Sequence, residues 1–594
     1  MKRTLLACIT LSLLAACKPA APPPSTAAAP DPAMNAAFAA LSQRAVASWL
    51  ARSPVFATQM GEHRYDSELD DYSAEGRQEA LSDAQTMLTE LGTLDRSKLS
   101  RDNQVDAAIL ANELQYRVWR EQSLQDWAWD PQVYNDLAGN AVYSLMAREF
   151  APLPQRLQSA IARMEKLPTL LAQARANLDP ARVPKIHAET VARQNAGILG
   201  IVTEFITPHA KELSAADQKR LAAATVALKK AVQEQQRWLD KTLVPNARGD
   251  FRLGAALYDQ KLKFALLSSL SRAEIKQRAE AEITRVRGDM YGIARGLLKD
   301  KAPALPDAPT PEQQQAAIEA ALELAYADRP ARDKVVEAAT AALQSATDFA
   351  RSKDLLTLPD SPVKIILMPE FQRGVTVAYS DSPGPMDRNL TALYAVSPIP
   401  ADWGKAQVDS YLREYNNRQI HLLSIHEGLP GHYLEGWHSA KNPSMLRAVL
   451  RSGLFAEGWA VYTEHMMQEQ GYLDGDPLFH LVQLKFYLRT VANAILDQGV
   501  HVDGWTREQA MDLMVKQTFQ QQSEAAGKWV RVQLTSAQLP TYFVGVQEFL
   551  DLRAAEQKKL GDRFNLRAYH DQVLSYGAPP VRFAREMMLD EPIG

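Results

Sequence analysis

The feature that most constrains this chain is a pair of histidines six positions apart with a proline–glycine dipeptide between them. The stretch reads His-Glu-Gly-Leu-Pro-Gly-His and runs from His426 to His432. On an unbroken α-helix this spacing rotates the second side chain by roughly 240° from the first, so the two imidazoles would point apart. Pro430 cannot donate a backbone hydrogen bond to the carbonyl of His426, and Gly431 can adopt backbone angles closed to other residues. We therefore expect a broken or widened helix that brings His432 back beside His426.

A histidine followed by a glutamate and a second nearby histidine is typical of a zinc site. In the H-E-x-x-H arrangement the two histidines bind the metal, and the glutamate acts as general base on the metal-bound water. By this comparison His426 and His432 are candidate zinc ligands, and Glu427 is the candidate base. A catalytic zinc site usually has three protein ligands and one open position, so a third ligand is needed from elsewhere in the chain.

The third ligand is predicted in the stretch Phe-Ala-Glu-Gly-Trp-Ala-Val-Tyr-Thr-Glu at 455–464. Glu457 lies 25 residues after His432, which leaves room for a turn and a second helix that runs back past the first. Glu464 shares its helix face and could orient a ligating histidine. Taken alone, Glu457 could instead cap its helix or form a salt bridge. Two other histidines are alternative ligands in principle, and we interpret both as surface or packing residues: His438 and His465.

The N-terminus has the pattern of a targeting segment. Two basic residues precede a mostly apolar run at 5–14, and Leu-Ala-Ala-Cys then ends at Cys17. This order resembles a bacterial lipoprotein signal, which predicts a signal peptide at 1–16 and a lipid on Cys17; a plain secretory signal is the alternative. Residues 17–33 are mostly Ala, Pro, Ser and Thr, which predicts an extended tether. By resemblance to enterobacterial sorting, Lys18 favours the outer membrane, with the protein facing the periplasm.

Composition excludes several classes of protein. The 594 residues are 46% hydrophobic and 23% charged, which is ordinary for a soluble protein. Loss of Lys2 and Arg3 with the signal peptide would take the formal net charge from −4 to −6, and so mild an acidic balance argues against a nucleic-acid partner. No later segment has the ~20 consecutive apolar residues of a membrane span, so the lipid is the expected anchor. The only cysteines are Cys8 and Cys17, so no disulfide is expected after cleavage.

Apolar residues recur at helical spacing through most of the remaining chain. The clearest predicted helices are 34–50, 75–94, 102–119, 154–176, 188–206 and 215–239. Helix starts with capping patterns are predicted at Ser214, Ser271, Thr310 and Thr506. Three short segments between Pro362 and Pro398 are instead rich in β-branched or aromatic residues and separated by turns, which predicts strands at 363–367, 374–379 and 390–396.

These patterns predict a mainly α protein, with a large helical fold and a small β-sheet just before the helix of the metal motif. A proline-rich polar segment at 299–311 is predicted to be a long loop between two halves. The first half is an N-terminal helical region at 34–300, and the second is a mostly helical region at 301–594 that carries the predicted zinc site. An edge strand of the sheet could pair with an extended peptide.

The motif H-E-G-x-P-G-H followed by E-G-W-A-x-Y-x-E resembles the bacterial domain-of-unknown-function 885 family. Further similarity lies in 249–254 with Tyr258, in 542–553, and at His570 and Gly577. The family comprises lipoproteins related to helical gluzincin zinc peptidases such as the thimet-oligopeptidase-like and Taq-carboxypeptidase-like enzymes. The resemblance implies a helical metallopeptidase-like fold and a role for each of four residues: His426, His432 and Glu457 as zinc ligands, and Glu427 as the base.

Hydrolysis of an amide also requires a group that stabilises the tetrahedral oxyanion. Helical gluzincins commonly use a tyrosine or histidine from a later segment, and the resemblance makes Tyr542 the first candidate and His570 the second. Tyr542 follows Pro-Thr at a predicted helix start, with Gly545 on the same face; a core aromatic is the other interpretation. Two arginines could bind a substrate carboxylate, although such residues are more often ordinary surface arginines: Arg388 and Arg553.

We therefore expect a zinc-dependent hydrolase of the cell envelope. Within this class we expect a metallopeptidase that acts on peptides, with Glu427 as general base. Two alternatives are open: a zinc hydrolase of non-peptide amides or esters, and a non-catalytic envelope binding lipoprotein on the same fold. The absence of a ligand or of the base would favour the binding protein. The motifs contain all three proposed ligands and the base.

Overall fold

The computed structural model describes residues 29–300, 305–361, 363–368 and 378–594. Within these ranges the chain is mainly α-helical with one small sheet, as predicted. The predicted signal peptide at 1–16 and the lipidation site Cys17 lie outside the described residues, as does most of the predicted tether at 17–33. Among the helices of the described ranges, none combines the length and the apolar character that a membrane crossing requires.

The predicted helices of the first half are present, with small shifts at their ends. They are α1 (Pro32–Arg52), α3 (Ala74–Gly92), α4 (Arg101–Trp119), α7 (Leu153–Asn177) and α10 (Ala215–Trp238). The predicted helix at 188–206 is instead divided into α8 (Lys185–Gln194), α9 (Gly197–Ile201) and a π-helical turn at Val202–Ile206. Asn195 lies at the division, where its buried side chain donates to the carbonyl of Val232 in α10. A contact with another helix therefore accompanies this interruption.

The helix starts follow the predicted capping residues. Ser271, Thr310 and Thr506 each form a reciprocal capping box with the residue three positions later, and Ser214 accepts a hydrogen bond from the backbone N–H of Asp217. Such caps stabilise a helix by about 1 kcal/mol each. The remaining helices of the first half are α2 (Pro54–Gln59), α5 (Asp126–Trp129), α6 (Gln132–Met146), α11 (Val244–Asn246), α12 (Gly254–Leu266) and α13 (Arg272–Leu298).

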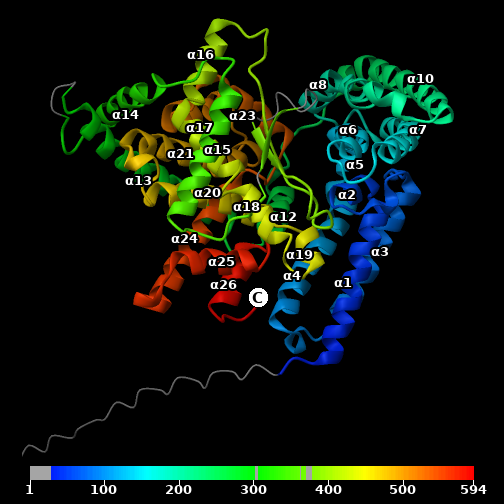
Figure 1. Cartoon of the computed structure of the whole chain (residues 1–594), viewed down its shortest axis with the longest axis horizontal. Helices are drawn as coiled ribbons and strands as arrows, with labels where there is room; N and C mark the ends of the chain where they lie inside the picture. Colours follow the sequence, from blue (N-terminus) through cyan, green and yellow to red (C-terminus); the bar gives the residue numbers. More distant parts are fainter. Residues whose placement is uncertain (1–28, 301–304, 362, 369–377) are drawn as a thin grey trace, which may run out of the picture.

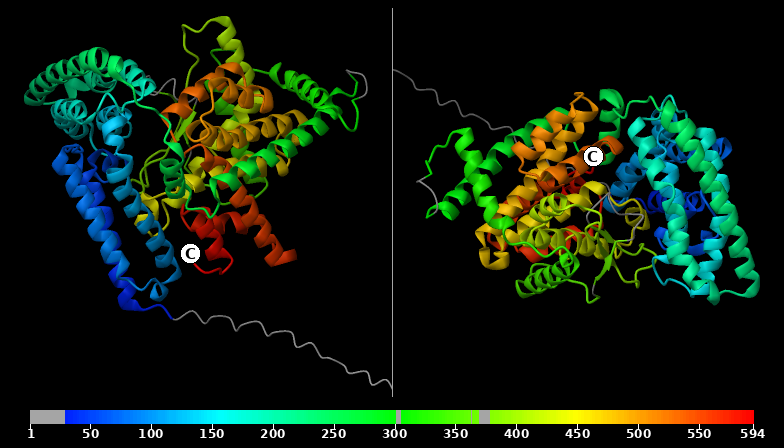
Figure 2. Two further views of the ribbon diagram at one scale, coloured as in Figure 1. Left: turned by 180° about the vertical axis from the view of Figure 1, so that it is seen from behind. Right: turned by 90° about the horizontal axis from the view of Figure 1, so that it is seen from above.

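The hydrophobic side chains form several cores, which distinguish an N-terminal region from a second region that begins at Tyr258. Helices α1, α3 and α4 share one core together with Leu446 and Val449, and α6, α7 and α10 share a second. A third, larger core begins at Tyr258 and extends to Met588. Figures 1 and 2 show the N-terminal helices along one side of the molecule and the helices of the third core along the other. Helix α13, which precedes the predicted boundary at 300, packs into this third core through Ile275, Val286 and Met290.

The sheet has three short strands: β1 (Lys364–Leu367), β2 (Ala378–Asp381) and β3 (Leu393–Val396). Their order is β1-β3-β2, with β1 parallel and β2 antiparallel to β3, so β2 forms an edge within the described residues. The predicted strands at 363–367 and 390–396 are confirmed in shortened form. The predicted strand at 374–379 overlaps β2 only at its end, and residues 369–377 lie outside the described part of the chain.

The helices of the third core complete the fold. They include α14 (Pro311–Tyr326), α15 (Val335–Ser352), α16 (Lys405–Glu414), α17 (Asn417–Glu427), α18 (His432–Ser439), α19 (Met445–Val449), α20 (Gly453–Glu469), α21 (Pro477–His501), α22 (Arg507–Met511), α23 (Gln522–Leu534), α24 (Pro540–Leu560), α25 (Leu566–Ser575) and α26 (Val581–Met588). Helices α20 and α24 cross closely because Gly458 faces Gly545: a Cβ on Gly458 would lie 2.5 Å from the carbonyl carbon of Gly545. This crossing places Tyr542, near the start of α24, and Glu457 of α20 in the wall of one cleft.

Candidate metal centre

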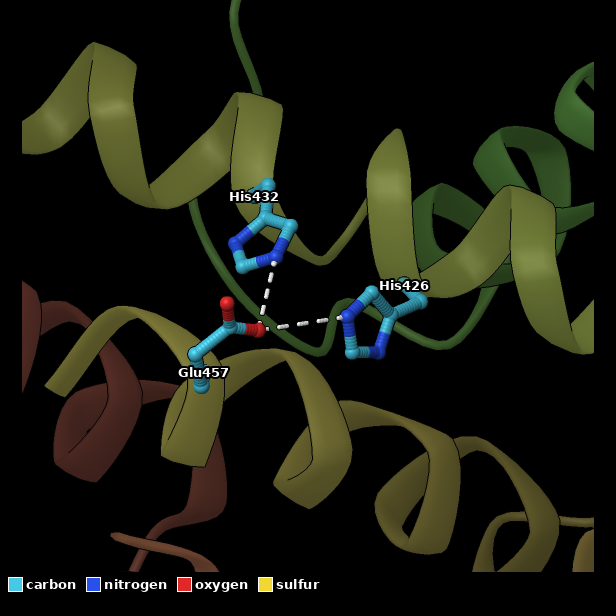
Figure 3. Close-up of side chains that lie close together, drawn as sticks. All are labelled: His426, His432 and Glu457. Atoms are coloured by element: carbon cyan, nitrogen blue, oxygen red, sulfur yellow. Dashed lines mark ion pairs between the residues drawn. The ribbon is translucent and has the colours of Figure 1, made fainter. Parts of the chain in front are cut away.

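The helix that carries His426 ends one residue later, and a new helix begins at His432. Between them Gly428 has φ −104° and ψ −115°, and Gly431 has φ −82° and ψ −127°, so both leave the helical conformation. A Cβ at position 431 would lie 2.0 Å from the carbonyl oxygen of His426, a distance that only glycine avoids. The predicted interruption of the helix is confirmed, and Figure 3 shows the two imidazoles facing one space from separate helical segments.

The stretch at 455–464, which lies in α20, holds this turn in place. The indole Nε1 of Trp459, a fully buried residue of α20, donates to the carbonyl of Pro430 at 2.9 Å. Helix α20 therefore fixes the backbone between the two histidines and also supplies the third side chain of the site, Glu457.

Replacing Gly431 with alanine should destabilise the protein, because the new Cβ would overlap the carbonyl of His426. We expect a loss of roughly 1–3 kcal/mol in the free energy of unfolding, as for other overpacked sites. Denaturant unfolding of the variant and the parent measures this difference. Gly288→Ala is the matched control, because Gly288 is exposed on α13 and its Cβ would meet no atom within 4 Å; it should be neutral or slightly stabilising. Equal stability of the Gly431→Ala protein and the parent would show that the turn tolerates a side chain.

Three side chains meet across the space between α17, α18 and α20. Oε2 of Glu457 lies 3.3 Å from Nε2 of His432 and 3.6 Å from Nε2 of His426 (Figure 3). The two imidazole centroids are 4.7 Å apart, and their planes are nearly perpendicular at 87°. Each residue offers one atom that can ligate a metal, and these three atoms lie within 4.8 Å of one another. Elsewhere in the described ranges, no other group of three His, Cys, Asp or Glu side chains converges in this way.

Glu464 orients the imidazole of His426. Its Oε1 lies 2.7 Å from Nδ1 of His426, and its side chain is buried about two helical turns after Glu457 on the same face of α20. Since an ionised carboxylate only accepts hydrogen bonds, Nδ1 of His426 donates to Glu464, and Nε2 is the nitrogen that faces Glu457 and that could bind a metal ion after losing its proton. This carboxylate–histidine arrangement is the one that commonly supports a metal-ligating histidine.

The electrostatics of the three side chains favour a bound cation. Oε2 of Glu457 is buried and has no hydrogen-bond partner among the described residues. Burial alone would raise the pKa of Glu457, but the two histidines hold it well below its ordinary value. Burial alone would lower the pKa of His426, but the carboxylates of Glu457 and Glu464 outweigh burial and raise it to about 10. Carboxylates that attract a proton this strongly would also attract a divalent cation, so these residues could hold a metal ion.

Glu427 lies beside this cluster, and its side chain lines a cleft together with the three clustered side chains. Its Oε2 accepts a hydrogen bond of 3.0 Å from the backbone N–H of Ser380 in β2, so the sheet orients the carboxylate. Burial raises the pKa of Glu427 above its ordinary value, although His432 and His426 act in the opposite direction. A carboxylate with a raised pKa is better suited to accept a proton and to release it later.

The cluster lies in the wall of a cleft of about 1240 Å³ between the two regions of the chain. The N-terminal region contributes polar residues of α6 and α8, among them Asn140, Arg193 and Gln194. The other wall contains the metal-centre residues, strand β2 and part of α23 and α24. The site is therefore accessible, and both regions can contact a molecule that enters the cleft.

Tyr542 lines this cleft and also packs, partly buried, against the third core. Its ring lies 6.4 Å from the ring of His426, centroid to centroid, and the two planes are inclined by only 17°. Its hydroxyl oxygen lies 3.5 Å from Nη2 of Arg531 and 3.5 Å from Nε2 of Gln538. Burial raises the pKa of Tyr542 to about 12, so the hydroxyl keeps its proton at neutral pH and can donate a hydrogen bond.

His570 lies away from the cleft, contrary to what a catalytic role requires. It is fully buried, its Nε2 accepts a hydrogen bond of 2.7 Å from the hydroxyl of Tyr462, and its Nδ1 donates to the carbonyl of Leu355 at 2.8 Å. Burial lowers the pKa of His570 to about 4, which fits a neutral ring with one donor and one acceptor nitrogen. Both nitrogens are engaged inside the core, and this position argues against His570 as a catalytic residue.

The other side chains considered from the sequence lie outside the metal centre. His438 contacts the carbonyl of Thr357, and His465 lies against Gln483 and the ring of Tyr487. Of the two predicted carboxylate-binding arginines, Arg388 is exposed and donates to the carbonyl of Pro385, and Arg553 pairs with Glu469. Neither arginine lines the cleft.

Two residues of the site were not identified from the sequence. Ser380 contributes a backbone N–H, which no side-chain pattern reveals, and Arg531 lies in a helix without a recognisable motif. The only local signal for Arg531 is its position ahead of Tyr542, which it contacts from the preceding helix.

Comparison with known proteins agrees with the resemblance in the two motifs. The model of the family described as bacterial protein of unknown function (DUF885) matches residues 54–588. No curated protein matches the sequence. A solved structure described as a lipoprotein of unknown function from Shewanella oneidensis is 32% identical, with a TM-score of 0.78, and the similarity covers 93% of this chain and 99% of that one.

A second solved structure, described as a lipoprotein from Colwellia psychrerythraea, is 18% identical, with a TM-score of 0.76. The similarity covers 94% of this chain and 100% of that one, and at this identity it bears on the fold alone. The matched family model spans most of the chain, including both regions and the candidate metal centre. The chain therefore belongs to the DUF885 family of bacterial proteins of unknown function.

Proposed function

We propose that this protein is a zinc-dependent hydrolase of the bacterial cell envelope that cleaves peptide bonds. The observation that carries the proposal is the convergence of His426, His432 and Glu457 in the wall of the cleft, with Glu427 beside them. These residues match the three protein ligands of a catalytic zinc site, with a carboxylate placed to act as general base.

The donor atoms suit zinc. Two imidazole nitrogens and one carboxylate oxygen form the His₂Glu set found in catalytic zinc sites, which leaves a further position for water or substrate. Oε2 of Glu457, which accepts no hydrogen bond among the described residues, and Nε2 of each histidine face the same space. Imidazole and carboxylate ligands also bind other divalent transition metals, so the assignment to zinc rests on the comparison with known catalytic sites.

Each neighbouring residue has a proposed task in hydrolysis. Bound zinc would supply Lewis-acid polarisation of the substrate carbonyl and of a water molecule. Glu427 takes the proton from the water and passes it to the leaving amine, and its orientation depends on the N–H of Ser380. Tyr542 donates its hydroxyl proton in a hydrogen bond to the oxyanion as the carbonyl is attacked.

Peptides are the proposed substrates because of the shape of the cleft. Its volume of about 1240 Å³ exceeds the ~300–1,000 Å³ typical of small-molecule pockets. Ser380 and Asp381 of the edge strand β2 lie in its wall, where an extended chain can align along the sheet. These features favour a peptide over a small amide or ester.

The location in the envelope is proposed from the N-terminus and from one relative. Cys17 follows a lipoprotein-type signal in the sequence, and the 32% identical solved structure from Shewanella oneidensis is described as a lipoprotein. We propose a lipid anchor on Cys17 that holds the protein on the outer membrane, with the cleft open to the periplasm.

The proposal is tested by digestion of a mixed peptide library. The mature protein loaded with zinc should cleave a subset of the peptides, and mass spectrometry should locate the new termini. Removal of the metal with a chelator should abolish cleavage, and added zinc should restore it. If the zinc-loaded protein leaves every peptide intact but hydrolyses simple esters or amides, the first alternative replaces the proposal. If it hydrolyses neither class, a binding lipoprotein replaces it.

A further inference from the structure

A smaller inner pocket of about 290 Å³ opens beside the metal centre. It shares His426, Glu427, Arg531 and Tyr542 with the main cleft, so a molecule can occupy both spaces at once. Four aromatic side chains form part of its wall: Trp403, Tyr411, Tyr415 and Phe486. The space is sufficient for one residue of a substrate, placed next to the bond at the metal centre.

Helix α23 turns a charged face to this pocket. Glu524, Lys528 and Arg531 follow one another at intervals of four and three residues, and all three line the pocket. Glu524 is already neutralised, because it pairs with Arg489 at 2.6 Å and accepts a hydrogen bond from the hydroxyl of Tyr415. In the part of the chain that the structure describes, neither Lys528 nor Arg531 forms an ion pair with a carboxylate.

The other buried Lys and Arg side chains of the described ranges are held either by a carboxylate or, as for Arg156 and Arg163, by several backbone carbonyls. Lys485 lies 2.8 Å from Glu414, and Arg447 lies 2.5 Å from Asp106. Lys528 is only 4% exposed, and burial, together with Arg489 and Arg531, lowers its pKa well below the ordinary value. A buried amine without a counter-ion loses its proton more readily, so an anion in the pocket would favour the charged form of Lys528 and would be stabilised by Arg531 as well.

Arg531 is placed to contact a substrate. One guanidinium nitrogen, Nη2, donates to the side-chain oxygen of Gln538 at 2.9 Å and lies 3.5 Å from the hydroxyl of Tyr542. Its Nε and Nη1 make no hydrogen bond within the described ranges, and the side chain lines both the cleft and the inner pocket. A guanidinium with free donors in a fixed plane is suited to a carboxylate, which it can bind through two parallel hydrogen bonds.

We propose that the inner pocket binds a carboxylate of the substrate through Arg531 and Lys528. The inference rests on the proposed hydrolase function, because it assigns the substrate group that lies next to the bond cleaved at the metal centre. The carboxylate belongs either to the C-terminus of a peptide or to an Asp or Glu side chain. The first source makes the protein an enzyme that acts at C-termini, and the second makes it selective for acidic residues.

The test is peptide binding to the zinc-loaded Glu427→Gln protein, measured by calorimetry so that no turnover is required. The probes are short peptides prepared as free acids and as C-terminal amides, each in a form with Glu and a form with Gln. We expect at least a tenfold loss of affinity on amidation if the C-terminus is bound, or on replacement of Glu by Gln if a side chain is bound. Addition of Arg531→Gln should abolish this difference, and Arg531→Lys should retain part of it.

Arg507→Gln is the matched control, because Arg507 is exposed at the start of α22 and outside both cavities. It should leave the preference for a carboxylate unchanged. Circular dichroism verifies that each variant is folded; if Arg531→Gln is not, Arg531→Lys and Lys528→Met replace it.

Equal affinity for acid and amide and for Glu and Gln peptides would overturn the inference, as would no binding by any peptide acid at millimolar concentration. A carboxylate preference that Arg531 variants leave intact would also overturn it. Because binding is measured without hydrolysis, a carboxylate preference can stand even if the peptidase proposal fails, and peptide cleavage without such a preference defeats this inference alone.

Discussion

Replacement of Glu427 by glutamine should leave zinc bound and reduce the kcat for peptide hydrolysis by roughly 10²–10⁴-fold. Glutamine has nearly the same shape, and its side-chain oxygen can still accept the hydrogen bond from the N–H of Ser380. It cannot take a proton from water, so the step assigned to Glu427 fails while the three ligands remain. Elemental analysis of zinc and rates of peptide hydrolysis should be measured on the same preparations.

The control for this variant is Glu469→Gln, which removes a carboxylate near the end of α20 that pairs with Arg553 away from the cleft. It should keep both zinc and activity. A zinc-loaded Glu427→Gln protein that turns over substrate at the parental rate would contradict the role of Glu427 as the base. Loss of zinc together with activity would instead show that Glu427 helps to hold the metal.

Replacement of Glu457 by alanine should have the largest effect on metal binding. Glu457 supplies the one carboxylate oxygen that lies near both Nε2 atoms, at 3.3 Å and 3.6 Å. Its loss removes a ligand and the negative charge that attracts the cation. The zinc content after dialysis should fall from one equivalent toward zero, as measured by elemental analysis and by competition with a coloured chelator.

Glu464→Gln provides a graded comparison, because Glu464 contacts His426 and not the other two side chains. Loss of such an orienting carboxylate typically weakens metal binding by ~10–100-fold, so this variant should retain measurable affinity. If Glu457→Ala binds zinc as tightly as the parent, Glu457 is not a ligand. If Glu464→Gln loses more affinity than Glu457→Ala, the roles of the two carboxylates are exchanged.

Much of the helical fold could be predicted because its signals are local. The apolar periodicity of α1, α4 and α10 and the caps at Ser271 and Thr506 depend only on neighbouring residues. The interruption between the two histidines was also predictable, since Pro430 and Gly431 act on the backbone of their own turn. Where a contact with another element intervenes, prediction was poorer: α8 and α9 divide at Asn195, which bonds to α10.

The candidate site could be predicted only in part, for the same physical reason. The motifs indicated His426, His432 and Glu457 through their spacing and through resemblance, and the structure brings these side chains together. The position of His570 in the core could not be predicted, because its neighbours Tyr462 and Leu355 lie far away in the sequence. The same applies to Arg531, whose role depends on the inner pocket.

The sequence by itself determined the mainly α fold, the small sheet, the broken helix and the residues able to form a metal centre. Each of these follows from the backbone preferences of short segments or from side-chain chemistry that is present wherever the residue lies. Only the tertiary structure decided which groups share one space: Glu464 against His426, Ser380 against Glu427, and Arg531 beside Tyr542. These contacts arise from the packing of helices and a strand that are distant in the sequence, and the close crossing at Gly458 and Gly545 sets that packing around Glu457.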